Sequence, residues 1–345
     1  MFTSSLTKIK ELCLHHIGNK SADEGIVLSK NALPIDELSY SSLMKYCFSS
    51  FKSEEFYCFY NEVGYEYNEV MGCVKEIFNT PSLLFDNSKV LARLLYSKSE
   101  HPNIKSGDFL LIYFCDCEIN GYITDAIGIY KSENLSQYIS LNCTTESVNI
   151  TTQSGLDIKH VDKAALVFNV DADSGYSIAI IDNTNGKVDT KYWVDDFLGV
   201  KPRQDKYFQT QNFMSVCKSF VTKQLPSEFE VSKADQAEIL NRSVQYLREN
   251  DEFSMQDFTE TVLEHPEVIE SFQAYKERYQ TERDIEIEDS FAISNDAVKK
   301  QARSFKSVIK LDKNFHIYVH GNRNLIEQGE DEKGRYYKVY YNEEY

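Results

Sequence analysis

Residues 109–130 read FLLIYFCDCEINGYITDAIGIY, two apolar runs separated by Asn120-Gly121. Asn-Gly favours the tight turn whose twist matches two antiparallel strands, and it is the strongest short-range hairpin signal in this sequence. The flanking runs, Phe109–Cys117 and Tyr122–Tyr130, are rich in the aromatic and β-branched residues that strands prefer. We therefore predict an antiparallel hairpin here, and with it a sheet of antiparallel strands.

Further strand and helix signals lie on both sides of this hairpin. Residues 9–17 alternate well enough to form a strand, which would place His15 and His16 on opposite faces, one in the core and one at the surface. A second hairpin is predicted from 164–170 and 177–181. Helices are predicted to follow residues suited to the N-cap position. These are Asp36, Asn68 and the pair Asn87-Ser88.

Length and composition favour two folded domains. A chain of 345 residues is long for a single core, and 42% hydrophobic residues are typical of a folded protein. Helices predicted over 234–249, 254–263 and 267–283 follow a change of pattern at Pro226. We expect an α+β fold with mixed, mainly antiparallel sheets and amphipathic helices. Its two domains would be an N-terminal α+β domain, 1–225, and a C-terminal domain, 226–345.

Charge is unevenly distributed along the chain. The net charge is −17, and residues 228–289 contain eighteen acids against six bases. Residues 298–341 contain ten Lys and Arg against five acids. An acidic protein is repelled by phosphate, so DNA binding would need a local basic surface. The C-terminal domain would therefore combine an acidic helical segment, 228–289, with a basic helix-plus-sheet segment, 294–341.

The basic segment is predicted to fold as a short helix followed by strands. Ser294 suits the N-cap of the helix, and apolar or aromatic runs at 308–311, 315–320 and 336–341 indicate strands. Basic side chains on such elements form a surface for a polyanion, and the alternative is a solvated exterior. The candidates for phosphate contacts are Lys299, Lys300, Arg303, Lys306, Lys310, Lys313 and Arg323. No base-reading motif is visible, so little sequence specificity is expected.

Two stretches resemble a known family. These are SVIKLDKNFHIYVHGNRNLIEQGEDEKGRYYKVYY at 307–341 and LLYSKSEHPNIKSGDFLLIYF at 94–114. In sequence and order they are similar to the two halves of the bacterial nucleoid-associated protein family of the NdpA/YejK type. The resemblance covers essentially the whole chain, although the acidic middle matches only loosely. It implies binding of double-stranded DNA in the nucleoid without known catalysis, and it assigns no binding residue.

Candidate catalytic and metal sites are weak. His316 and His320 would share one strand face with Tyr318, as a metal or phosphodiesterase pair would, but no further ligand follows at a metal-like spacing. Asp171 and Asp173 faintly resemble a calcium loop that lacks its closing Glu. Glycine-rich phosphate loops are absent. We therefore assign no catalytic residue, metal ligand or cofactor, and expect no enzyme.

Location and partners follow from the same features. The eight cysteines lack metal-ligand spacing, and the sequence contains neither a secretory signal nor a run of about 20 apolar residues. A cytoplasmic protein of the nucleoid with unpaired thiols is expected. Its partner would be double-stranded DNA, with no membrane, a possible protein partner at the acidic segment and a possible homo-oligomer. The alternatives are an interaction adaptor that uses the acidic segment and, least favoured, a phosphodiester-processing enzyme.

Overall fold

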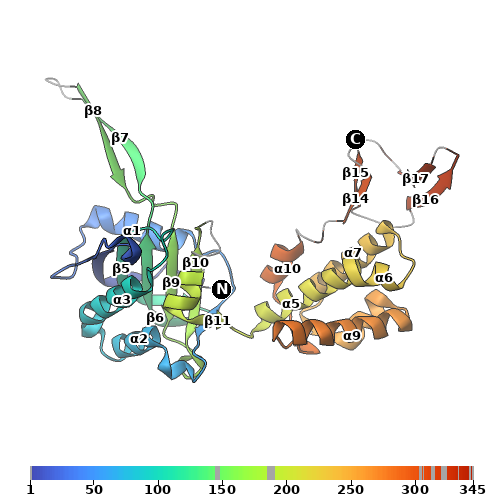
Figure 1. The fold of residues 1–345 in the computed structure, drawn as a ribbon, viewed down its shortest axis with the longest axis horizontal. Helices are drawn as coiled ribbons and strands as arrows, with labels where there is room; N and C mark the ends of the chain where they lie inside the picture. The colour runs from blue at the N-terminus through green and yellow to red at the C-terminus, as the bar shows by residue number, and fades with distance from the viewer. Residues whose placement is uncertain are drawn as a thin grey trace. The chain divides into compact units, whose positions relative to one another are not determined.

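The computed structural model describes residues 2–143, 148–184, 191–302, 305, 307–311, 315–319, 325–332, 334–341 and 343. Contacts divide the chain into two compact units, Met1–Arg203 and Gln204–Tyr345 (Figure 1). Helices combine with antiparallel sheets, so the predicted α+β class is confirmed.

The first unit alternates strands with three main helices. In chain order its elements are β1 Phe2–Thr3, β2 Lys8–Ile17, β3 Ile26–Leu28, α1 Glu37–Ser49, β4 Tyr57–Phe59, α2 Glu69–Asn79, α3 Leu84–Lys98, β5 Gly107–Ile119, β6 Tyr122–Ser132, β7 Ser136–Cys143, β8 Val148–Gly155, β9 Lys163–Phe168, β10 Ser177–Asp182, a helical segment Lys191–Leu198 and β11 Val200–Pro202.

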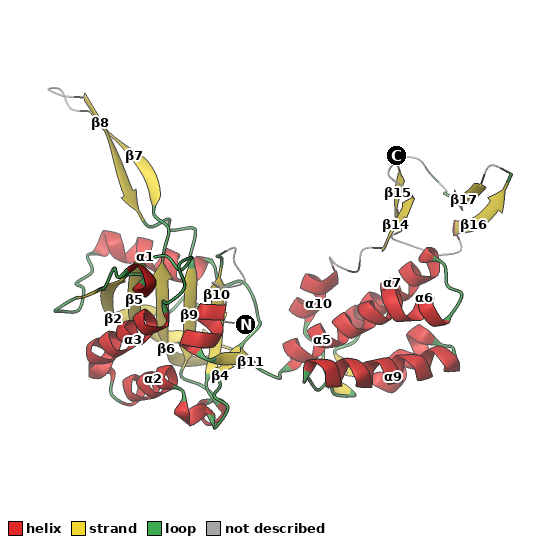
Figure 2. Cartoon of the chain, viewed as in Figure 1, coloured by secondary structure: helices red, strands yellow, loops and turns green. Residues whose placement is uncertain are grey.

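Nine of the strands described in this unit form one antiparallel sheet. Their order is β11-β4-β10-β9-β6-β5-β2-β3, with β1 added beside β5. Helices cover both faces, α2 and α3 on one and α1 on the other (Figure 2). In β5, Phe109 and Leu111 pack into the core under α2 and α3, while Leu110 and Ile112 pack into the core under α1. A strand buried on both faces is apolar at every position, which explains the unbroken apolar run in the sequence.

The predicted hairpins are present. β5 and β6 pair antiparallel around Asn120 and Gly121, whose φ angles of 50° and 82° suit a tight hairpin turn. β9 and β10 form the second hairpin. His15 is buried and His16 exposed, as their opposite faces predicted.

Two of the three helix starts were predicted correctly. The side chains of Asp36 and Asn68 accept hydrogen bonds from the N–H groups of Ser39 and Met71, so they are the N-caps of α1 and α2. The third prediction is wrong, because α3 begins at Leu84 and contains Asn87 and Ser88. These two polar residues hydrogen bond to carbonyl groups of the preceding turn, which lets them lie inside the helix.

The two strands β7 and β8 form a separate two-stranded hairpin, here called the arm. Figure 1 shows the arm extending away from the sheet of its unit. It joins β6 to β9, and nearly all of its described residues are exposed. No strand was predicted in this part of the sequence.

The second unit is mainly helical. Its elements are α5 Lys206–Ser219, continued by Phe220–Gln224 and α6 Leu225–Glu228, then α7 Lys233–Glu249, β12 Glu252–Ser254, α8 Met255–Phe258 continued by Thr259–Leu263, α9 Pro266–Arg283, β13 Ser290–Ala292, α10 Asn295–Ala302, β14 Ser307–Leu311, β15 Phe315–Val319, β16 Ile326–Asp331 and β17 Gly334–Val339.

Phenylalanines dominate the core of the second unit. Phe213 of α5 contacts Phe253, Phe258 and Phe272, with ring centroids 4.2–6.4 Å apart. Because α5 contributes to this core, the contacts place the division between the units before α5, at Arg203 and Gln204. The sequence predicts the boundary later, near Pro226.

The two C-terminal hairpins pack on the start of α7. Leu311 of β14 and Ile317 of β15 lie against Ala234 of α7 and Ile326 of β16. The strands predicted at 308–311 and 315–320 are present as the antiparallel pair β14 and β15, and residue 320 lies outside the described residues. The strand predicted at 336–341 is present as β17, which begins earlier, at Gly334.

Candidate nucleic-acid interface

Helix α10 carries the first two of the seven predicted phosphate-contact residues. Its N-cap is Ser294, as predicted, whose hydroxyl accepts a hydrogen bond from the N–H of Ala297 at 3.3 Å. Ala297 and Val298 are buried, and α10 packs against α5 and α7. The apolar side of α10 therefore holds the helix in place, and the next two positions, 299 and 300, are exposed to solvent.

Lys299 and Lys300 occupy these two positions and are exposed. The side chain of Lys299 is 76% exposed and forms an ion pair of 3.5 Å with Asp296, three residues earlier. The ammonium of Lys300 lies 5.5 Å from the centre of the Tyr207 ring, a cation–π contact with α5. An exposed ion pair contributes little to stability, so Lys299 can exchange Asp296 for a phosphate at small cost.

The other five predicted residues lie at or beyond the end of α10. Lys310 is in β14, where it pairs in register with His316 of β15. Arg303, Lys306, Lys313 and Arg323 lie outside the described residues, as does His320. The predicted interface is therefore described at α10 and along the backbone of the β14–β15 hairpin.

The last hairpin, β16–β17, does not add to the basic surplus. Lys338 lies 3.5 Å from Glu327, and Arg335 lies 3.7 Å from Glu330, both across the two strands. A hydrogen bond from Lys338 to Tyr340, together with Glu327, raises the pKa of the Lys338 ammonium. The surplus is concentrated in residues 297–325, which contain seven Lys and Arg against one acid, Asp312. The seven predicted phosphate-contact residues are these seven bases.

Aromatic rings accompany the basic residues. Phe315, Tyr336, Tyr340 and Tyr341 are exposed. The ammonium of Lys338 lies 4.7 Å from the centre of the Tyr340 ring. Exposed rings can stack on unpaired bases, but the charge beside Tyr340 is that of Lys338, which Glu327 already pairs.

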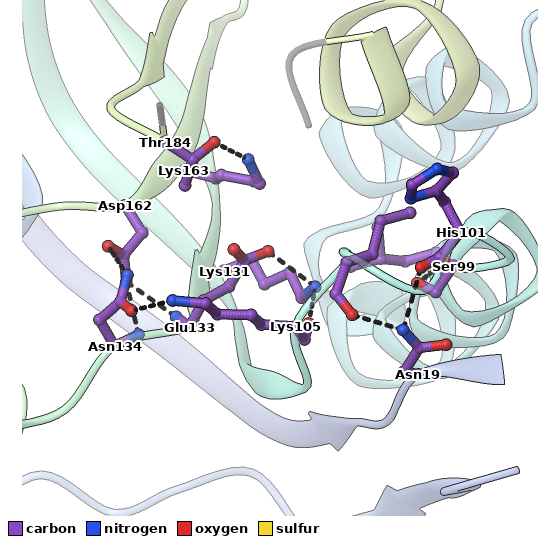
Figure 3. A network of polar contacts seen from close by, with 12 residues as sticks. Asn19, Ser99, His101, Lys105, Lys131, Glu133, Asn134, Asp162, Lys163 and Thr184 are labelled. Atoms are coloured by element: carbon purple, nitrogen blue, oxygen red, sulfur yellow. Dashed lines mark hydrogen bonds and ion pairs between the residues drawn. The ribbon is translucent and has the colours of Figure 1, made fainter. Parts of the chain in front are cut away.

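A second group of lysines, in the first unit, is not available to a polyanion. Lys131 of β6 and Lys163 of β9 are partners across the sheet and completely buried. Figure 3 shows the network that holds them. Lys131 pairs with Glu133 at 2.9 Å and Lys163 with Asp182 at 3.1 Å. Because a carboxylate compensates each buried ammonium, we interpret the network as one that stabilises the fold and does not bind a ligand.

The described residues contain neither a cluster of metal ligands nor a helix that could span a membrane. No group of three or more His, Cys, Asp and Glu there could hold a metal ion. Each cysteine is a free thiol. No helix in this part of the chain is both long enough and apolar enough to cross a membrane.

The acidic helical segment contains an open pocket of about 800 Å³ between α7 and the start of α9. Its apolar lining includes Phe229, Ile239 and Val268. Its acidic residues are Glu230, Asp235, Glu238, Glu264 and Glu267. Glu264 forms an ion pair with Arg242, and this pairing lowers the pKa of the Glu264 carboxyl. The pocket therefore combines apolar surface with negative charge.

Residues 13–338 match the protein-family model described as nucleoid-associated protein YejK. The chain belongs to this family. The match spans both units and includes α10, β14, β15, β16 and β17 as far as Lys338. Membership confirms the family predicted from the two quoted stretches and places the chain at the nucleoid, as predicted. No curated protein matches the chain.

Proposed function

We propose that this nucleoid-associated protein binds double-stranded DNA through phosphate contacts from the basic residues of 299–323, with little sequence specificity. The single observation that carries the proposal is the surplus of seven bases over one acid in residues 297–325 of a chain whose net charge is −17. Family membership supports a DNA partner. The exposure of Lys299 and Lys300 on a helix held by the core supports their role in particular.

The acidic remainder of the chain shapes this interaction. Residues 228–289 carry a net charge of −12, from eighteen acids and six bases, and repel phosphate. Binding would therefore be confined to the basic residues. Phosphate contacts do not distinguish base pairs, so affinity would vary little among duplex sequences.

The test is a titration of duplex DNA of mixed sequence at a series of salt concentrations. If four to six phosphates are contacted, log affinity should fall linearly with log salt, with a slope of roughly −4 to −5. A slope near zero in a protein that still binds would overturn the phosphate assignment. The titration is repeated with magnesium, because strand cleavage would favour the phosphodiester-processing alternative.

A second candidate function is that of an adaptor that binds a basic protein segment. The acidic pocket between α7 and α9 favours it, because apolar surface beside negative charge suits a basic amphipathic helix. Replacement of Glu238 and Glu267 by Gln would remove two charges from the pocket and keep side-chain length. If this variant binds DNA as the parent does but loses a protein partner, both functions are present on one unit.

A further inference from the structure

The arm has one apolar face. In the register of β7 and β8, Leu141 pairs with Ile150 and Cys143 with Val148, and Ile139 precedes them on the same face. The opposite face pairs Asn142 with Asn149, Ser140 with Thr151 and Tyr138 with Gln153. Ile139, Leu141, Val148 and Ile150 are 66%, 75%, 75% and 71% exposed. Four large apolar side chains are thus gathered on one face and left in contact with water.

The base of the arm is firmly held. Glu133 and Asn134 lead into β7, and Asp162 lies just before β9. One carboxylate oxygen of Asp162 accepts hydrogen bonds from the backbone N–H groups of Glu133 and Asn134, at 2.8 and 2.9 Å. The other accepts one from the side-chain amide of Asn134 at 2.8 Å, and Asn134 also bonds Lys105. Figure 3 shows these contacts beside the buried lysines.

A contact on its apolar face would stabilise the arm. An isolated two-stranded hairpin is marginally stable in water, and a third strand or a packed apolar face is usually required. The two strands contain no charged residue, and 135–156 contain only Glu146. Without Lys or Arg, the arm has no electrostatic attraction for nucleic acid or for an anionic membrane.

We propose that the apolar face of the arm is a self-association surface, on which the same face of a second copy of this chain packs. Copies with a charge of −17 repel each other over most of their surface, and the uncharged arm is where two can approach at least cost. A two-fold interface brings the same patch of both copies together, so an apolar face meets an apolar face.

The area of the face suits such an interface. Burial of one Leu, Ile or Val side chain removes on the order of 100 Å² of apolar surface from water, so four from each copy account for roughly 800 Å². These side chains alone account for most of the approximately 1,000 Å² that a specific interface requires. The contact is of moderate size, so the dimer should dissociate on dilution.

Sedimentation equilibrium of the full chain over a dilution series tests the proposal. The parent should form a dimer that dissociates on dilution. The variant Leu141→Thr with Ile150→Thr should self-associate at least about 100-fold more weakly, because two apolar side chains are lost from each copy. Threonine suits a strand and both sites are exposed, so the melting temperature of the dilute protein should not change.

The matched control is Asn142→Thr with Asn149→Thr, a paired double substitution on the opposite face of the same strands. It should dimerise as the parent does. Hydrogen exchange of the amides in β7 and β8 should slow as the parent concentration rises. A parent that stays monomeric at every concentration would overturn the proposal, as would a Leu141 and Ile150 variant that dimerises normally. A monomeric parent that loses DNA affinity on the same substitution would assign the arm to nucleic acid instead.

Discussion

Lys131 and Lys163 face each other across β6 and β9, and both side chains are completely buried. Their ammonium groups lie 5.1 and 5.9 Å from the centre of the Tyr192 ring. Two like charges can occupy such a site only if each is compensated, here by Glu133 and Asp182. Loss of either carboxylate would leave a buried charge uncompensated, so the stability of the first unit depends on both pairs.

Replacement of Glu133 by Gln should lower the free energy of unfolding by about 3 kcal/mol, because it leaves the buried ammonium of Lys131 without its carboxylate. The double variant Glu133→Gln with Lys131→Met should recover part of this loss, since it removes the uncompensated charge. Denaturant unfolding of the single and double variants measures both. Glu100→Gln is the control, because the Lys20–Glu100 pair is exposed. Equal stability of parent and Glu133→Gln would show that the pair contributes nothing.

His15 should make the first unit less stable in mild acid. Its Nε2 lies 2.8 Å from the hydroxyl of Ser88, and its Nδ1 accepts a hydrogen bond from the N–H of Ser29. Burial, with Lys89 and Arg93 nearby, lowers the pKa of His15 from its usual 6.5. The unfolded chain therefore takes up a proton at a pH where the folded chain does not. The stabilisation is complete above pH 6.5 and is lost as the pH falls below it.

Melting temperatures of the parent and His15→Gln, measured between neutral pH and about pH 5, check this titration. The variant should be less stable at neutral pH, and its melting temperature should fall less steeply as the pH falls. The exposed His101→Gln is the control and should keep the parent's dependence. Parallel curves for the parent and His15→Gln would exclude His15 as the titrating group.

Local signals predicted local structure. The Asn120-Gly121 turn and the caps Asp36, Asn68 and Ser294 depend on residues a few positions apart, and the sequence shows all of them. The place of β4 between β10 and β11 depends on long-range packing, which no local pattern contains. The start predicted for α3 was too late, because Asn87 and Ser88 are typical N-cap residues. Their position inside the helix depends on contacts between distant residues, such as that of Ser88 with His15.

The arm was missed although its signal is present. Ile139, Leu141 and Cys143 alternate with polar residues, as do Val148 and Ile150, and this period of two is typical of a strand. Alternation normally indicates a face buried in the protein's own core, whereas here that face is exposed. Of the predicted interface, the helix and the positions of Lys299 and Lys300 followed from the sequence. Four of the other candidate bases, Arg303, Lys306, Lys313 and Arg323, lie outside the described residues, so their place in the interface stays a prediction.

The division of the chain before α5 predicts how fragments behave. A fragment of residues 1–203 should fold alone with a cooperative melting transition, because it contains the complete sheet and the helices on both faces. A fragment of residues 1–225 should bind a hydrophobic dye more strongly, because it exposes Phe213 and Phe220 of the second core. If 1–225 is the better folded fragment, the boundary belongs near Pro226, as the sequence predicts.

Replacement of Lys299 and Lys300 by Gln separates a binding surface from a solvated exterior. Both residues are exposed on α10, and Gln keeps helix propensity, so the melting temperature should be almost unchanged. Each lost phosphate contact should reduce the magnitude of the salt slope by about one, so the double variant should lose about two and bind all duplex sequences more weakly. Titrations of two unrelated duplexes at several salt concentrations measure this.

The control is Lys223→Gln with Arg248→Gln. It removes two charges from exposed positions of the same unit that lie outside residues 297–325, and it should leave the slope unchanged. If the two variants lose the same affinity, net charge alone governs binding, and α10 is not part of the interface.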